Sequence, residues 1–237
     1  MIILSQNYNI NNISKNNNLY DNLNIDSSKL NIFYINVGQA DSTFITINGI
    51  NMLIDVGNNQ DGYYITEFLK AQNVNKIDYF ILTHCDEDHI GEAYRILEEL
   101  QIETVYMPKK ENETNTYEKL LKSIEKKNIN FNRDLQVSNE TTYDLGNANW
   151  KVLSIDSGSD ENDSSIVVEV DYINTKYLFM GDASSSVESK VKWNDVNVLK
   201  VSHHGSKSAT SQEFLDKVKQ EYVIISVKEP NNYNLPS

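Results

Sequence analysis

The stretch from Thr83 to Gly91 constrains the chain most, because it reads T-H-C-D-E-D-H-I-G directly after the apolar run Tyr79 to Leu82. A buried strand that ends there delivers the chain to a sheet edge, where the side chains of the next turn can converge. Imidazole nitrogen and carboxylate oxygen form the ligand set of zinc, manganese and iron sites. Four such groups lie within six positions, namely His84, Asp86, Asp88 and His89. The pattern predicts a site for two adjacent metal ions rather than a solvated acidic loop.

The other two histidines of the chain occupy a second position of the same kind. The sequence contains four histidines, and His203 and His204 follow the apolar strand expected over residues 196–201. A Gly-Ser pair and small polar residues come after them, which argues against histidines buried in a core. Every histidine therefore sits at the end of an expected strand, as the ligands of one shared site would.

Six ordered segments resemble the metallo-β-lactamase superfamily, and in particular the ComEC-like branch of competence DNA-uptake proteins. The H-x-D-x-D-H segment is similar to the superfamily's H-x-H-x-D-H, with Asp86 in place of a histidine. The other matching segments are V-G-Q-A-D-S (37–42), L-I-D-V-G (53–57), N-D-S-S (162–165), F-M-G-D (179–182) and L-K-V-S-H-H-G-S (199–206). The resemblance spans residues 31–236 and implies an α/β fold, the four-layer αββα metallo-β-lactamase sandwich.

The resemblance also implies a set of metal ligands. His84 and Asp86 would bind one divalent ion, Asp88 and His89 a second, and Asp182 would bridge the two. Capping of the helix expected near Ser184 is a further role open to Asp182. His204 directly precedes a glycine, as the superfamily's ligand histidine does, so we expect it to complete the site. The ions would be zinc or manganese, and the exchange of a histidine for Asp86 shifts the preference towards manganese.

Further residues are expected to act around these ligands. Two ions would activate a shared water as hydroxide, Asp88 would orient that hydroxide, and His203 would protonate the leaving group. Alternation along the strand would separate His203 from His204. Residues expected to orient ligands or meet substrate are Asp41, Asp55, Asn162, Ser165 and Ser206. Asn162 and Ser165 stand where the superfamily's third-motif histidine is absent, and they either contact substrate or form a turn.

Two features depart from the family pattern. No histidine lies between His89 and His203, a departure that the ComEC-like branch shares. The family's N-x-Y-G-H-P segment, normally followed by a helix and a strand, reads N-Y-N-L-P here with Leu235 in place of the histidine. With Ser237 as the end, the domain would lack its last helix and strand. The sheet edge so exposed would be covered by a second copy or a partner chain, or would reflect a shortened chain.

Composition limits the classes of partner. The 237-residue chain carries a net charge of −13, so a basic face that grips long duplex DNA is not expected. Single-stranded nucleic acid or a nucleotide fits better, since bound cations change the field at the site itself. The single cysteine, Cys85, forbids an internal disulfide and fits a reducing compartment. No stretch predicts a signal peptide or membrane span, so we expect a cytoplasmic protein without a membrane partner.

Patterning predicts one domain over residues 29–237 after an Asn-rich extension over residues 1–28, which is either loosely docked or begins with a short edge strand. Apolar runs predict strands over 32–37, 43–47, 52–55, 77–83, 104–107, 142–145, 150–155, 165–171, 176–180, 196–201 and 222–227. Helical periodicity predicts helices over 62–72, 93–100, 117–127, 185–193 and 211–219. Asn48-Gly49 predicts a two-residue hairpin. Two blocks of strands, each followed by helices, suit two packed sheets.

These features favour a metal-dependent hydrolase, most directly a phosphodiesterase or nuclease that acts on a phosphodiester substrate. An enzyme that hydrolyses a lactam or thioester is a second hypothesis, weakened by the missing third histidine. A non-catalytic binding or regulatory module on the same fold is a third, motivated by Leu235 and weakened by the complete ligand set.

Overall fold

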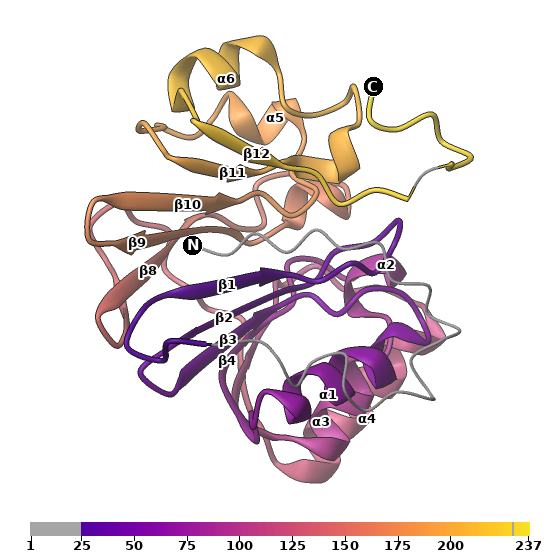
Figure 1. Cartoon of the computed structure of the whole chain (residues 1–237). Helices are drawn as coiled ribbons and strands as arrows, with labels where there is room; N and C mark the ends of the chain where they lie inside the picture. The colour runs from indigo at the N-terminus through magenta and orange to yellow at the C-terminus, as the bar shows by residue number, and fades with distance from the viewer. Residues whose placement is uncertain (1–24, 229) are drawn as a thin grey trace.

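Two six-stranded sheets pack face to face, with helices on both outer faces, in the computed structural model of the chain (Figure 1). The structure describes residues 25–228 and 230–237. This arrangement confirms the expected α/β four-layer αββα sandwich. The extension expected over residues 1–28 lies outside the described residues except for its last four, 25–28.

The first sheet contains six strands in sequence order. They are β1 (Asn31–Tyr34), β2 (Thr43–Ile47), β3 (Ile50–Ile54), β4 (Lys76–Ile81), β5 (Gln101–Tyr106) and β6 (Asn130–Asn132). Strands β1 to β3 are antiparallel, and the Asn48-Gly49 hairpin has the positive φ values, 50° and 79°, that a tight two-residue turn requires. Strands β3 to β6 are parallel, so their carboxyl ends lie at one edge of the sheet.

The second sheet has the order β12-β11-β10-β9-β8-β7. Its strands are β7 (Tyr143–Leu145), β8 (Ala148–Ser154), β9 (Val167–Tyr172), β10 (Thr175–Phe179), β11 (Val198–Lys200) and β12 (Tyr222–Ile224). Strands β10, β11 and β12 are parallel, which brings their carboxyl ends together as well. Strand β12 forms the edge, and its Tyr222 and Val223 are 50% and 46% exposed. The second copy or partner chain expected at this edge stays a prediction.

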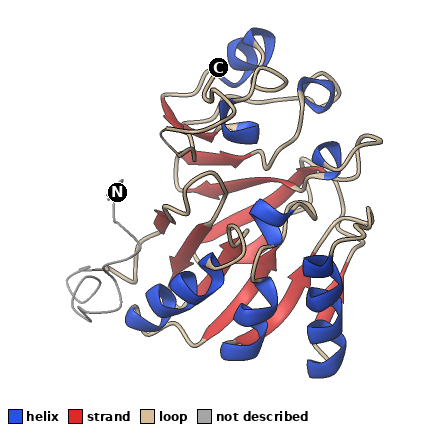
Figure 2. Ribbon diagram, turned by 90° about the vertical axis from the view of Figure 1, so that its right-hand side faces the viewer, coloured by secondary structure: helices blue, strands red, loops and turns tan. Residues whose placement is uncertain are grey.

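Helices cover the outer face of each sheet (Figure 2). The helices α1 (Asp61–Ala71), α3 (Ala93–Glu99) and α4 (Asn115–Lys127) pack on the first sheet, and α5 (Ser185–Glu188) and α6 (Gln212–Val218) on the second. Helix α4 shows why: Tyr117, Leu120 and Ile124 form one buried stripe, and the Thr114 hydroxyl caps the first turn by accepting the Tyr117 N–H. No helix in the described part of the chain is long and apolar enough to cross a bilayer.

The strands expected over 32–37, 196–201 and 222–227 are shorter in the structure, as β1, β11 and β12, and three further elements differ from the sequence prediction. The strand β6 was not predicted, because its sequence Asn-Phe-Asn contains a single apolar residue and forms no apolar run. The one-turn helix α2 (Glu87–Ile90) was not predicted either, because it lies within the acidic motif. The helix expected over residues 185–193 ends at Glu188. The Trp193 indole N–H folds back and donates to the Glu188 carbonyl at 2.7 Å, so this carbonyl is satisfied without further helix.

The core between the sheets is centred on Trp150, which is fully buried. The Tyr143 ring stacks on it at 4.4 Å between centroids, while Tyr79 and Tyr106 meet it edge-on at 5.2 and 5.7 Å. Offset-stacked and edge-to-face pairs of this kind add to the stabilisation from burial alone. The two sheets therefore form a rigid base for the loops that leave their strand ends.

Candidate metal centre

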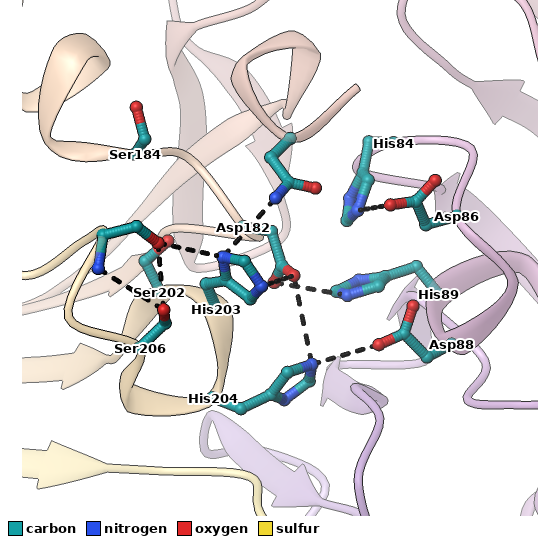
Figure 3. A network of polar contacts seen from close by, with 12 residues as sticks. His84, Asp86, Asp88, His89, Asp182, Ser184, Ser202, His203, His204 and Ser206 are labelled. Carbon is teal, nitrogen blue, oxygen red and sulfur yellow. Dashed lines mark hydrogen bonds and ion pairs between the residues drawn. The ribbon is translucent and has the colours of Figure 1, made fainter. Parts of the chain in front are cut away.

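The carboxyl ends of parallel strands from both sheets deliver the candidate ligands to one place. The acidic motif follows β4 and continues into α2, Asp182 follows β10, and His204 follows β11. Figure 3 shows the Asp182 carboxylate in the middle of the group, with His89 to its right, His203 to its left and His204 below it. The structure brings Asp88, His89, Asp182 and His204 together from these strand ends, and their roles as metal ligands stay a prediction.

Four side chains form the larger of two close groups of potential ligands among the described residues. The donor atoms of Asp88, His89, Asp182 and His204 all lie within 4.8 Å of one another. The His89 Nε2 atom is 3.2 Å from Asp182 Oδ1, and the His204 Nε2 atom is 3.2 Å from Asp88 Oδ2 and 3.9 Å from Asp182 Oδ2. Two imidazoles and two carboxylates are a suitable ligand set for zinc, manganese or iron.

Unpartnered buried atoms test whether this group fits a metal ion. His89 donates its Nδ1–H to Asp55 Oδ2 at 2.8 Å, so its Nε2 atom is left as an acceptor that faces the Asp182 carboxylate. Both His89 Nε2 and Asp182 Oδ1 are buried and lack a hydrogen-bond partner. Two facing acceptors repel each other unless a cation, either a proton or a metal ion, lies with them. The geometry therefore fits a divalent metal.

The electrostatics of the metal-free protein show the same demand for positive charge. Burial acts to lower the pKa of His89, but the carboxylates of Asp182 and Asp55 outweigh it and hold that pKa well above its ordinary value. Burial acts to raise the pKa of Asp182, yet the His89 ring holds it well below its ordinary value. Burial likewise opposes ionisation of His204 and Asp88, but their contact outweighs it, so the pKa of His204 is raised and that of Asp88 is lowered.

His84 and Asp86 form only part of a second group. The buried His84 ring lies 4.1 Å from the His89 ring, and its Nε2 atom lacks a hydrogen-bond partner and faces Asp86 Oδ2 at 3.6 Å. Neither residue belongs to a group of three or more candidate ligands among the residues that the structure describes. The second ion therefore stays a prediction. Fewer donor atoms surround its position than surround the first, because the superfamily's third-motif histidine is absent from this chain.

The histidine pair lies outside the strand, contrary to the expected alternation. His203 and His204 lie in the short helical turn η3 (Ser202–Gly205), where they adopt φ values of 48° and 52°. This left-handed backbone, rather than strand alternation, separates the two imidazole rings, whose centroids lie 6.2 Å apart and whose planes make an angle of 75°. His204 is buried against Asp88, whereas the His203 side chain is 31% exposed with its Nε2 atom 3.9 Å from Asp182 Oδ2. Their assignment as ligand and proton donor stays a prediction.

Several predicted accessory residues contact the candidate ligands. Asp55 accepts hydrogen bonds from His89 and from both the backbone N–H and the hydroxyl of Thr83, at 2.7–2.8 Å. Ser165 Oγ accepts the Asp182 N–H at 3.1 Å, and the Asn162 amide lies 3.4 Å from His203 Nδ1. The sequence prediction did not include Thr83, although its position at the very end of a buried strand, beside His84, was a usable signal.

Two other residues, Ser206 and Cys85, lie away from the ligand group. The Ser206 hydroxyl contacts Ser208 at 2.9 Å and reaches the centre only through it, since Ser208 Oγ lies 3.4 Å from His203 Nδ1. The Cys85 thiol is buried against the Lys110 carbonyl, 3.5 Å away, and burial raises its pKa. A buried thiol that stays in its neutral form is suited to packing rather than to metal ligation.

Gly91 fixes the position of helix α2 beneath this centre. A Cβ atom at Gly91 would overlap the backbone of Asn58 and Gly57, which belong to the loop after β3. We expect Gly91→Ala to lower the free energy of unfolding by about 1–3 kcal/mol, as overpacking does, and to weaken metal binding because α2 carries Asp88 and His89. Urea unfolding and a metal titration would measure these effects.

A second glycine provides the control for that substitution. Gly49 has a positive φ of 79°, and a Cβ atom there meets nothing within 4 Å. Gly49→Ala should therefore cost only backbone strain of about 1–2 kcal/mol and leave metal binding unchanged. Equal metal affinity in the Gly91 and Gly49 variants would contradict the role assigned to Gly91.

The chain belongs to the metallo-β-lactamase superfamily, since the family model described as Metallo-beta-lactamase superfamily matches residues 35–227. This superfamily consists mostly of metal-dependent hydrolases and typically binds divalent metals. ComE operon protein 3 of Bacillus subtilis (strain 168) is 28% identical over 234 residues, covering 89% of this chain and 30% of that protein. Recombination protein 2 of Haemophilus influenzae is 27% identical over 211 residues, covering 85% of this chain and 25% of that protein.

These relatives confirm the resemblance to ComEC-like competence proteins at low identity. The chain spans 30% or less of the length of either one. Among solved structures, the metallo-β-lactamase-fold protein YhfI from Bacillus subtilis has a TM-score of 0.57 at 10% identity, covering 86% of this chain and 88% of that protein. This likeness shows the shared fold.

Proposed function

We propose that the protein is a metal-dependent phosphodiesterase or nuclease. The observation that carries the proposal is the convergence of Asp88, His89, Asp182 and His204, with unpartnered acceptor atoms facing each other inside the group. The exchange of a histidine for Asp86 and the similarity to the ComEC-like relatives over most of the chain support a phosphoryl substrate over an acyl one.

The four-residue group would hold one ion, and His84 with Asp86 would hold a second next to Asp182. Divalent ions at these positions would supply a water of lowered pKa and would neutralise charge on the phosphate oxygens. Asp88, whose side chain is 32% exposed, would accept a hydrogen bond from the attacking water and orient it. The new P–O bond forms from this water as the bond to the leaving alkoxide breaks.

His203 suits protonation of that leaving alkoxide. Its ring is the most accessible of the histidines, and its Nε2 atom lies on the Asp182 side of the centre. The Asn162 amide and the Ser208 hydroxyl both lie 3.4 Å from its Nδ1 atom and hold the ring in place. In the protonated ring, Nδ1–H would donate to the Ser208 hydroxyl, and Nε2–H would pass its proton to the leaving oxygen. A positioned acid of this kind contributes at least about 10²-fold to a rate.

The substrate class follows from charge. With a net charge of −13, the surface is unsuited to neutralising the many phosphates of a duplex, so a single strand or a small nucleotide is the proposed substrate. A cytoplasmic location is part of the same proposal, because the single cysteine suits a reducing compartment.

The test compares two phosphodiesters that differ in leaving group, in the presence of Mn²⁺ or Zn²⁺. Wild-type protein should hydrolyse bis-p-nitrophenyl phosphate and a dinucleotide, and EDTA should abolish both activities. In His203→Gln, the dinucleotide rate should fall about 10²-fold, whereas p-nitrophenolate leaves without a proton and its release should change little. Turnover of nitrocefin or a thioester with no phosphodiester hydrolysis would overturn the proposal.

A further inference from the structure

Lys200 places a charged group where the fold calls for an apolar one. It is the last residue of β11, whose neighbours Leu199 and Val201 pack under the outer helices of the second sheet. Lys200 consequently points inward, towards the first sheet, and its side chain is only 4% exposed. A buried ammonium is costly unless it is paired, so the position calls for a physical explanation.

Its partner is Asp41, 159 residues earlier in the chain. The Lys200 Nζ atom donates to Asp41 Oδ2 at 2.8 Å and to the Val201 carbonyl at 3.2 Å, and the Asp41 side chain is 7% exposed. Replacing a buried ion pair by apolar groups is often neutral or stabilising, so stability alone does not explain this one.

Asp41 connects the ion pair to both sides of the candidate metal centre. Its backbone N–H donates to the Asp88 carbonyl at 3.2 Å, and its own carbonyl accepts from Gly57 at 2.8 Å. Its second carboxylate oxygen, Oδ1, has no hydrogen-bond partner and lies 3.7 Å from His204 Nδ1. The same His204 nitrogen donates to the Ser226 carbonyl at 2.9 Å, which leaves Nε2 facing Asp88.

Asp41 also belongs to a second group of potential ligands. Donor atoms of Asp41, Asp55 and His89 lie within 4.8 Å of one another, behind the main centre. Without a nearby cation, this group would compete with the main centre for a metal ion or would take up a proton. The Lys200 ammonium already supplies the positive charge, and both Asp55 oxygens already accept hydrogen bonds from Thr83 and His89.

We infer that Lys200 is a positioning residue, whose ammonium acts as a built-in cation for Asp41 and thereby holds His204 and the Asp88 loop in their metal-binding arrangement. The inference rests on one part of the proposed function, namely that Asp88 and His204 are ligands of the metal ion. Lys200 itself is too deeply buried to touch substrate. The consequence is a defined loss of metal affinity when the charge is removed.

The experiment is a calorimetric titration of metal-free protein with Mn²⁺, in the absence of substrate. Lys200→Met should bind Mn²⁺ about 10-fold more weakly than wild type, the lower end of the range for residues that support metal ligands. Lys200→Arg retains the charge and should recover most of the affinity. Asp41→Asn, a nearly isosteric change, should reproduce the loss and serves as the second variant if Lys200→Met does not fold.

Lys151 offers a matched control on the same sheet. It is also a buried lysine, on β8, and its ion pairs are with Glu169 at 2.7 Å and Asp171 at 3.4 Å, both on β9 and outside the candidate ligand groups. Lys151→Met should lose thermal stability comparable to Lys200→Met while its Mn²⁺ affinity stays within about 2-fold of wild type. Equal affinities in the Lys200 and Lys151 variants, or wild-type protein that binds no Mn²⁺, would overturn the inference. A wild type that binds Mn²⁺ without hydrolysing phosphodiesters would instead overturn only the proposed function.

Discussion

Asp182→Asn is expected to reduce metal-dependent phosphodiester hydrolysis by about 10³-fold, the upper end of the loss when one preorganised electrostatic group is removed from a transition state. The substitution keeps the shape of the side chain but removes its charge. Asp182 is buried and faces three histidines, with His89 Nε2 at 3.2 Å and His203 and His204 Nε2 at 3.9 Å. An amide in its place cannot neutralise a cation there, so metal content should fall together with the rate.

Asp163 provides the matched control for this prediction. It is a second buried carboxylate nearby, and its Oδ1 atom accepts the backbone N–H of Ser184 at 3.1 Å, but it does not belong to the ligand groups. Asp163→Asn should therefore leave the metal content unchanged and the rate within a few-fold of wild type. The measurements are elemental analysis of the purified proteins and kcat on a dinucleotide. An Asp182→Asn protein with full metal content and near-normal kcat would refute the assignment.

The sequence predicted the features of the fold that depend on local pattern. Apolar runs located the strands that carry the centre and placed polar residues such as His84 at their ends. The place of Asp182 beside the other ligands came from the family resemblance. The hairpin at Asn48-Gly49 was predicted for a similarly local reason, since both residues tolerate positive φ.

Features that depend on tertiary contacts were beyond the sequence prediction. Lys200 lies in an apolar run, and its partner Asp41 is distant in the chain, so no local signal connects them. The divergence of His203 and His204 was predicted for the wrong reason, because their left-handed backbone in η3 is imposed by the loop after β11 rather than by residue type. Non-glycine residues held in such conformations are typical of functional sites.

The second large effect is a loss of metal affinity expected for Asp55→Asn, which would change the tautomer of His89. Asp55 accepts the His89 Nδ1–H at 2.8 Å, so in the neutral ring that would bind a metal ion the unprotonated nitrogen is Nε2, which faces Asp182. In the variant, the carboxamide oxygen can still accept the Thr83 N–H, but its NH₂ group would face His89 Nδ1. His89 would then carry its proton on Nε2, pointing at the metal position, and metal affinity should fall about 100-fold.

The metal-free form should also lose about 3 kcal/mol of unfolding free energy in Asp55→Asn, because one partner of a buried ion pair is removed. The pKa of His89 is raised in the folded protein, so the stabilisation from its charge is fully present below the unfolded pKa of about 6.5 and is lost as pH rises through the folded value. The difference in unfolding free energy between variant and wild type should accordingly be largest below about pH 6.5 and shrink at higher pH.

Urea unfolding across this pH range measures that difference. Thr83→Val is the comparison, because it removes one hydrogen bond to Asp55 and leaves the contact between Asp55 and His89 in place. A pH-independent difference would mean that Asp55 supports the fold through Thr83 alone.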